Sequence, residues 1–188
     1  KLERKRMKIG IVVGSIREGR NGLQVGTWVK EQAQAQGRSA EYELIDLKDF
    51  DVPLFTSATH PMMAKKHYDD PRVQAWSDAI DPCDAYILVT PEYNHGVPGA
   101  FKNAIDSLGA EWMGKPYAVV GYGSVGGVRA IENWRSILAN FSMVDVRNEI
   151  NVSLFTHFKD GVFTPTAHQN EDLKALFDSL EHLTGRLA

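Results

Sequence analysis

The sequence has little cysteine and no long apolar run. Its single cysteine, Cys83, rules out an intrachain disulfide, so a reducing, cytoplasmic location is expected. No segment approaches the roughly 18 consecutive apolar residues of a membrane-spanning helix, and no secretory apolar segment stands near the start. KLERKR, residues 1–6, is expected to be a basic prefix or a disordered tail, and residues 7–188 to form a single domain.

The chain also lacks an excess of positive charge and any obvious metal-binding spacing. Its net charge is −3, which argues against a nucleic-acid partner, because such proteins present a basic patch or stripe. None of the six histidines pairs with another at i, i+4, so no helical metal site is predicted. Six basic residues form either a local basic rim or scattered, solvated charge: Arg17, Arg20, Lys65, Lys66, Lys115 and Arg129.

The first of three informative segments follows an apolar strand, Ile9–Val13. The loop GSIREGRNG, residues 14–22, then leads into a helix with apolar residues at helical spacing. Glycines allow the backbone to approach an anion, and the helix start supplies free N–H groups and a positive dipole end. The loop has neither the Gly-Lys-Ser/Thr ending of a triphosphate site nor a G-x-G-x-x-G opening, so a monophosphate fits better. The alternative is a plain glycine-rich connection with solvated arginines.

Ser15, Arg17 and Arg20 are the side chains of this loop that can donate hydrogen bonds to a phosphate. Ser15 is not expected to be a nucleophile, because the turn lacks the Gly-x-Ser-x-Gly elbow of hydrolases.

The second segment is YILVTPEYNHGVPGAFKNAIDSL, residues 86–108. Tyr86–Thr90 read as a strand buried on both faces, which Pro91 ends. The polar turn Glu92–Gly96 follows, then an amphipathic helix with Pro98 at its first position and Gly109 as a left-handed cap. This turn is either a ligand-binding loop at the carboxyl end of a strand or an ordinary connection. His95 is expected to cap the turn or to face solvent.

The third segment has a glycine-rich loop of five residues after the strand Tyr117–Tyr122. In this loop, residues 123–127, the glycines permit close approach to a flat or bulky ligand, or simply tight packing of helix on strand. The following helix buries one stripe that includes Ile131, Trp134 and Leu138.

Two further strands, Tyr42–Ile45 and one near Val144–Leu154, complete a set of five that alternates with helices. A weaker helix is expected at Val73–Ile80, and a last one runs through Leu173 to Leu187, opened by the acidic and amide residues 170–172. This alternation predicts an α/β fold with a doubly wound, five-stranded parallel sheet and helices on both faces. The first two loops would meet at its switch point.

The three segments together resemble those of the NAD(P)H-dependent FMN reductases, flavodoxin-like flavoproteins that include quinone, azo-dye and chromate reductases. The matching stretches are GSIREGR, TPEYNHGVPGAFKNAID and GKPYAVVGYGSVGGVRA, and the similarity extends over nearly the whole chain from Met7. Many members have Ser and Asn where this chain has Arg20 and Gly22, although a subgroup shares its Gly-Arg-x-Gly form. That departure concerns the side-chain contacts to phosphate.

The resemblance implies the flavodoxin-like strand order 2-1-3-4-5 and FMN as the cofactor, and it names the residues that would hold FMN. The phosphate would lie against the first loop and the helix start, and the isoalloxazine between the second loop and the third. The residues are Ser15, Arg17, Arg20, Gly22 and Leu23 for the phosphate, Pro91, Glu92, Tyr93 and Asn94 for the ring's pyrimidine edge, and Gly123, Ser124, Gly126 and Gly127 for its other side.

The implied reaction passes hydride from NADPH or NADH to FMN and then to a quinone, flavin, azo or metal-oxyanion acceptor, with no protein side chain acting as acid or base. The alternative is an electron carrier or FMN-binding module without nicotinamide turnover. Relatives are dimers or tetramers, so a homo-oligomer is expected. Residues 51–70 are expected to form a lid, a subunit interface or an ordered surface excursion, and Ser153–His168 a hairpin-like extension or a partner surface.

Overall fold

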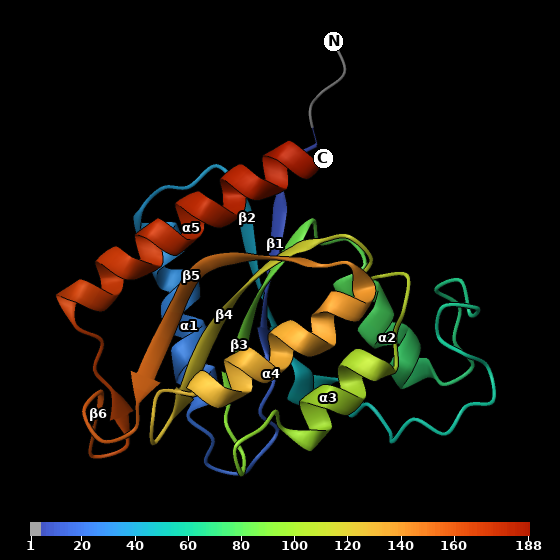
Figure 1. Cartoon of the computed structure of the whole chain (residues 1–188), viewed down its shortest axis with the longest axis horizontal. Coiled ribbons are helices and arrows are strands. Elements are labelled where there is room, and N and C mark those ends of the chain that lie inside the picture. Colours follow the sequence, from blue (N-terminus) through green and yellow to red (C-terminus); the bar gives the residue numbers. More distant parts are fainter. Residues whose placement is uncertain (1–4) are drawn as a thin grey trace.

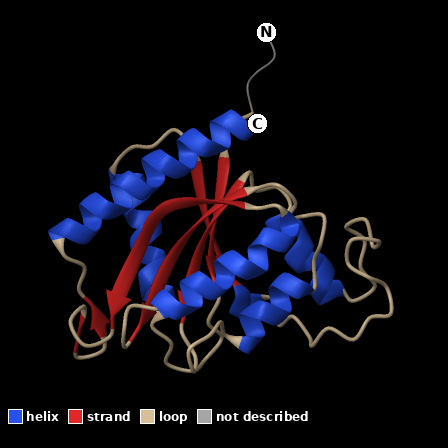
Figure 2. Cartoon of the chain, viewed as in Figure 1, coloured by secondary structure: helices blue, strands red, loops and turns tan. Residues whose placement is uncertain are grey.

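The computed structural model describes residues 5–188, and its centre is a parallel sheet of five strands. The strand order is β2-β1-β3-β4-β5, which confirms the predicted topology. Figure 2 shows the strands of the sheet with helices around them. All neighbouring pairs in this sheet are parallel. The strands are β1 (Lys8–Val13), β2 (Glu41–Asp46), β3 (Ala85–Pro91), β4 (Pro116–Gly123) and β5 (Val144–Ser153).

Helices cover both faces of the sheet, which explains why its central strands are apolar on both sides. Every residue of β3 and β4 is buried, whereas the edge strand β2 alternates buried and more exposed positions. Figure 1 shows the two helical layers. One face carries α1 (Gly22–Ala35) and α5 (Ala167–Leu187), and the other carries α2 (Pro71–Ile80), α3 (Gly99–Asp106) and α4 (Val128–Leu138). Two short 3₁₀ turns are η1 (Leu47–Asp49) and η2 (Ala139–Phe141).

Three buried tryptophans dominate the core beneath α2, α3 and α4. Trp76, Trp112 and Trp134 are all fully buried. Their indole N–H groups donate to the Ala104 carbonyl at 2.9 Å, the Ile105 carbonyl at 3.1 Å and the Thr90 hydroxyl at 3.0 Å, respectively. These bonds join α2 to α3 and α4 to β3, so the buried indoles fix the helices of this layer relative to one another and to the sheet.

The predicted boundaries of α3 are wrong at both ends. Pro98 is the extended cap residue, and the helix begins at Gly99. It ends at Asp106, and Gly109 does not adopt the left-handed conformation. A Cβ at Gly109 would lie 2.7 Å from the Met62 backbone nitrogen. Gly109 is therefore required by the close approach of another segment, which local sequence does not reveal.

The start of α5 also differs from the prediction. Thr166 is the cap, four residues before the expected acidic and amide cluster at 170–172. The Thr166 hydroxyl accepts from the Gln169 N–H at 3.1 Å, and the Gln169 side chain accepts from the Thr166 N–H at 2.9 Å. This reciprocal capping box satisfies two donors at once, so it outcompetes a single side-chain cap further along.

Residues 51–70 form a long excursion beside α2 and α3, at the right of Figure 1. Asn103 holds one end of it, accepting from the Phe55 N–H and donating to the Pro53 carbonyl, each at 2.9 Å. The buried Glu111 holds the other end, accepting from the Tyr68 hydroxyl at 2.8 Å. These contacts fix the excursion on the domain.

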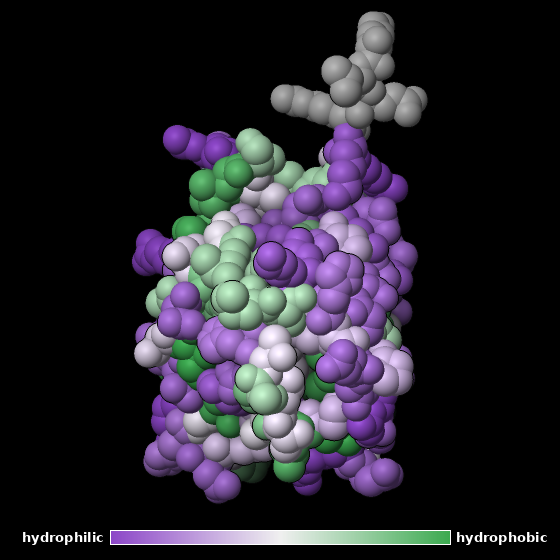
Figure 3. Space-filling view, turned by 90° about the vertical axis from the view of Figure 1, so that its right-hand side faces the viewer, coloured by the Kyte–Doolittle hydropathy of each residue, from purple (hydrophilic) through white to green (hydrophobic). Residues whose placement is uncertain are grey.

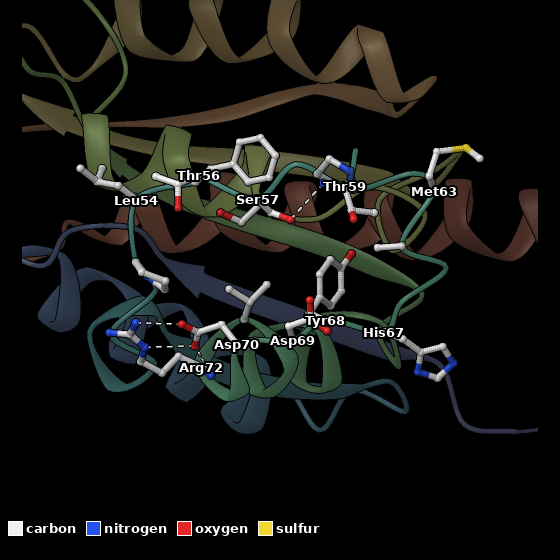
Figure 4. Close-up of a pocket in the computed structure, with 16 residues that line it drawn as sticks. Leu54, Thr56, Ser57, Thr59, Met63, His67, Tyr68, Asp69, Asp70 and Arg72 are labelled. Atoms are coloured by element: carbon white, nitrogen blue, oxygen red, sulfur yellow. Dashed lines mark hydrogen bonds and ion pairs between the residues drawn. The ribbon is translucent and has the colours of Figure 1, made fainter.

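The excursion encloses a cavity of about 620 Å³, shown in Figure 4. Leu54 and Met63 line the cavity, and both are more than two-thirds exposed. Figure 3, which views this side of the molecule, shows apolar residues scattered among hydrophilic ones. A lid or a subunit interface remains the prediction for this segment.

The segment after β5 contains the predicted hairpin. β6 (Phe158–Lys159) pairs antiparallel with β7 (Val162–Phe163). The Gln24 side chain of α1 clamps it, donating to the Gly161 carbonyl and accepting from the Phe163 N–H, both at 2.9 Å. The hairpin therefore lies beside the first turns of α1.

Of the predicted prefix, residues 1–4 lie outside the described residues. Arg6 donates to the Ser39 carbonyl at 2.6 Å and to that of Ala40 at 3.4 Å. Within residues 5–188, no helix combines the length and apolarity that crossing a membrane requires.

Candidate functional site

The structure brings the three predicted loops together at the carboxyl edge of the sheet. They follow β1, β3 and β4, which are adjacent and parallel, so all three loops leave the same edge. The Ser15 hydroxyl lies 3.2 Å from the Tyr93 hydroxyl, and the Arg17 guanidinium carbon lies 5.9 Å from the centre of the Tyr93 ring. The Glu92 N–H donates to the Tyr122 carbonyl at 3.3 Å. One continuous site is therefore possible here.

The start of α1 is open to an anion. Asn21 occupies the cap position, but its side chain makes no capping bond, and the first turn carries no acidic residue. The N–H groups of Gly22 and Leu23 have no acceptor within the helix, because the first four of any α-helix have none. Ser15 is only 2% exposed and lies beneath the same loop. These donors fit a phosphate at the positive end of the helix dipole.

Arg20 is committed to holding the first loop. Its guanidinium forms two contacts with the Asp46 carboxylate, and it donates to the Ser15 carbonyl at 2.6 Å. The hydrogen bond with Asp46 raises the pKa of Arg20. The structure thus places Arg20 as a tie between the loop and the end of β2, and leaves Arg17 as the exposed cation of the loop.

The second loop closes on itself in a tight two-residue turn. Tyr93 and Gly96 exchange backbone hydrogen bonds of 3.0 and 3.1 Å. Asn94 and His95 between them have positive φ angles of 50° and 70°, as such turns require. Side chains other than glycine adopt this conformation at a cost, and such strain gathers at functional sites. His95 is exposed, which confirms that it faces solvent.

Glu92 has a role that sequence reasoning missed. Its carboxylate accepts from the backbone N–H groups of Arg129 at 2.9 Å and Ala130 at 3.3 Å, and it also pairs with the Arg129 side chain. Gly127 precedes α4 and has no side chain with which to cap it. Glu92 supplies the missing cap across 37 residues of sequence, so the second and third loops are fastened together.

The third loop depends on left-handed glycines. Gly126 and Gly127 have φ angles of 74° and 72°. A Cβ at Gly127 would lie 2.7 Å from the Tyr122 backbone nitrogen. Ser124 at the tip is exposed, and Gly123 accepts from the Gly126 N–H at 3.2 Å. The loop is therefore a tight turn that leaves its outer backbone accessible.

The local basic rim is not formed. Arg20 and Arg129 each pair with a carboxylate of the site loops, Asp46 and Glu92. Lys66 and Lys115 contact Asp81, which follows α2 and precedes β3, at the opposite edge of the sheet. The alternative of scattered charge describes these side chains better. Within the described chain, residues 5–188, no cluster of three or more acidic, histidine or cysteine side chains suits a metal ion.

Comparisons with known proteins agree with this geometry. The sequence profile of the NADPH-dependent FMN reductase family matches residues 7–157. An NAD(P)H-dependent FMN reductase of Saccharomyces cerevisiae is 31% identical over 186 residues, 93% of this chain and 97% of that protein. An NAD(P)H-dependent FMN reductase of a Nectria species is 38% identical over 126 residues, which cover 65% of this chain and 63% of that protein. A quinone reductase of Escherichia coli is 28% identical, with 97% of this chain and 92% of that protein covered.

Among solved structures, the flavoenzyme NAD(P)H:(acceptor) oxidoreductase FerB from Paracoccus denitrificans superposes with a TM-score of 0.72. The two chains are 24% identical, and the match covers 94% of this chain and 98% of the other. This likeness confirms the flavodoxin-like fold. The family profile and the Saccharomyces cerevisiae relative show that the chain belongs to the NADPH-dependent FMN reductase family of oxidoreductases, whose cofactor is FMN.

Proposed function

We propose that this chain is an FMN-dependent NAD(P)H oxidoreductase whose flavin site is the junction of the three loops. The observation that carries the proposal is the open start of α1, which has free amides and no acidic residue, next to the contact between Ser15 and Tyr93 that joins the first and second loops. A phosphate requires such an anion site, and a flat ring requires accessible backbone next to it. Residues 7–188 would act as one domain.

The proposal gives each loop a task. The amides of Gly22 and Leu23, with Ser15 and Arg17, would hold the phosphate, while Arg20 keeps the loop in shape through Asp46. Backbone groups in 91–94 would contact the pyrimidine edge of the ring. Gly123, Ser124, Gly126 and Gly127 would flank its other side.

The chemistry that FMN supplies when bound is the acceptance of a hydride from the nicotinamide and the delivery of the two electrons to a second substrate. The protein's contribution is orientation and electrostatics. Backbone N–H groups of the second loop would favour negative charge on the ring's pyrimidine edge, because they are fixed dipoles in a partly dry site. We assign no side chain as a catalytic acid or base.

The proposed acceptor to test first is a quinone, since relatives from Escherichia coli and Pseudomonas putida are named quinone reductases. Free flavin, azo dyes and metal oxyanions are the further candidates. The paired basic residues give no reason to favour NADPH over NADH, so both donors belong in the test.

The test is a visible absorption spectrum of the purified protein after FMN is added and excess is removed, followed by anaerobic addition of NADPH or NADH. Loss of the flavin band with either donor is expected, and its return on adding benzoquinone would identify the acceptor class. Retained flavin that neither donor bleaches would contradict the proposal and favour an electron carrier.

We also propose that the chain forms a homodimer or homotetramer through residues 51–70. This excursion carries the exposed side chains of Leu54, Phe55 and Met63, which suit a contact between copies. Sedimentation equilibrium of the wild type and of Leu54→Glu would test this. A monomeric wild type would contradict the proposal.

A further inference from the structure

Tyr122 has a buried hydroxyl that lacks a hydrogen-bond partner among the described residues. Its side chain leaves β4 toward α1, and the residue is 5% exposed. Within residues 5–188 its oxygen has no hydrogen-bond partner. Most buried polar atoms are paired, because leaving one unpaired costs about 1–3 kcal/mol. The hydroxyl therefore requires an explanation.

The hydroxyl lies against the first residue of α1. A Cβ on Gly22 would be 2.5 Å from the Tyr122 oxygen and 3.3 Å from the ring carbon that bears it. The absence of a side chain at residue 22 therefore makes room for the hydroxyl at the open end of the helix. Two independent features, an uncapped helix start and an unpaired buried donor, meet at this point.

We propose that the Tyr122 hydroxyl donates a hydrogen bond to the FMN phosphate at the start of α1, in the space that Gly22 leaves free. This inference rests on the proposed function, because it concerns the same cofactor site. It gives Gly22 and Tyr122 one joint role: glycine at residue 22 removes a side-chain donor from the helix, and the tyrosine hydroxyl from the sheet below replaces it.

The surroundings keep this hydroxyl protonated and able to donate. Burial raises the pKa of Tyr122 well above its ordinary value. The Ser15 hydroxyl, which approaches the phenol without meeting hydrogen-bond geometry, lowers this pKa by less, as do the charges of Arg20 and Arg17. The nearby cations are partly occupied, since Arg20 binds Asp46. A neutral donor thus remains next to the helix amides, where an anion is the acceptor that would satisfy it.

The test compares FMN with riboflavin, which has the same ring but no phosphate. Tyr122→Phe removes only the hydroxyl, and we expect it to weaken FMN binding about 10- to 100-fold while riboflavin binding stays within about 2-fold. Tyr117→Phe is the matched control, because Tyr117 lies on the same strand but packs in the core on the other face. Fluorescence titration measures each Kd.

Thermal unfolding supplies a second readout. Apo Tyr122→Phe should be at least as stable as the apo wild type, because an unpaired buried group is gone, whereas its stabilisation by saturating FMN should be smaller. Gly22→Ala should lower both apo stability and FMN affinity, because the new methyl displaces the hydroxyl. Adding Tyr122→Phe to Gly22→Ala should recover stability but not affinity.

The outcomes separate the two proposals. If the wild type binds neither FMN nor riboflavin, the proposed function fails. If it binds FMN more tightly than riboflavin, and Tyr122→Phe keeps that ratio unchanged, the inference is overturned while the proposed function stands. An equal loss of both ligands would also overturn it, because the hydroxyl would then act on the ring or on the fold.

Discussion

The hydroxyls of Ser15 and Tyr93 lie 3.2 Å apart although 78 residues separate them along the chain. Ser15 is nearly fully buried at the end of β1, and Tyr93 begins the tight turn after β3. This contact joins the loop proposed for the phosphate to the loop proposed for the ring. The Arg17 guanidinium beside the Tyr93 ring adds a second link between them.

Two substitutions distinguish the proposed roles of the Ser15 and Tyr93 hydroxyls. Ser15→Ala removes a donor proposed for the phosphate and the contact between loops, so the FMN Kd should rise about 10-fold with riboflavin affinity unchanged. Tyr93→Phe removes the contact alone and keeps the ring beside Arg17. Its FMN Kd should rise less than about 3-fold, with a loss of about 1 kcal/mol in unfolding free energy. Equal effects of the two substitutions on FMN affinity would contradict a direct role for Ser15.

Glu92→Ala should destabilise the protein through α4. The backbone N–H groups of Arg129 and Ala130 lose their acceptor, and no side chain on Gly127 can replace it. Loss of such a cap costs about 1 kcal/mol and up to about 2 kcal/mol. Urea denaturation measures the change in unfolding free energy.

Glu132→Ala is the control for that substitution. Glu132 lies on the same helix, is largely exposed and pairs with Arg135, which keeps its contacts to Asp145 and Glu149. Removing this surface carboxylate should cost less than about 0.5 kcal/mol. A similar loss in both variants would mean that Glu92 contributes only as a surface charge.

Much of the fold could be predicted because it rests on local signals. The buried runs of β3 and β4 and the alternation with helices predicted a doubly wound parallel sheet. The resemblance supplied its strand order, and the structure confirms both. The acidic and amide cluster at 170–172 predicted the start of α5, whereas the helix begins after the capping box of Thr166 and Gln169. Two local signals for a helix start therefore lie close together, and the one that forms two reciprocal hydrogen bonds sets the start of the helix.

The details of the site could not be predicted because they join distant residues. The pairing of Arg20 with Asp46 and the cap that Glu92 provides for α4 depend on how three loops meet. Tyr122 reads only as a strand residue until its hydroxyl is seen beside Gly22. The residue types in each loop indicated which side chains gather at the carboxyl edge of the sheet. They did not indicate which side chains tie the loops together and which remain available to a ligand.

Gly127→Ala should cost more stability than Gly19→Ala, although both glycines are left-handed, with φ of 72° and 60°. A Cβ at Gly19 meets no atom within 4 Å, so only the backbone cost of about 1–2 kcal/mol applies. At Gly127 the Cβ would press on the Tyr122 backbone nitrogen, which adds about 1–3 kcal/mol. Denaturant titration of both variants tests this. Equal losses would show that the third loop can move aside.

Asp70 should make stability depend on pH in the acid range. The Arg72 guanidinium and the Arg72 N–H bind its carboxylate, as Figure 4 shows for the side chains, and they lower its pKa from 3.8 to about 2. Between these values the unfolded chain takes up a proton before the folded protein does, so the contribution of Asp70 is lost as pH falls from about 4 to 2. Asp70→Asn keeps a capping side chain for α2 but cannot ionise.

The measurement is the melting temperature of wild type and Asp70→Asn from pH 6 to pH 2. The wild type should be the more stable above pH 4. The difference should shrink as pH falls to 2, because Asp70 is then protonated in the unfolded chain and about half protonated in the folded protein. Asp69→Asn removes an exposed carboxylate from the adjacent residue and should not reproduce this pattern. A difference that stays constant across the range would mean that the Asp70 charge contributes nothing and that its hydrogen-bond geometry alone stabilises α2.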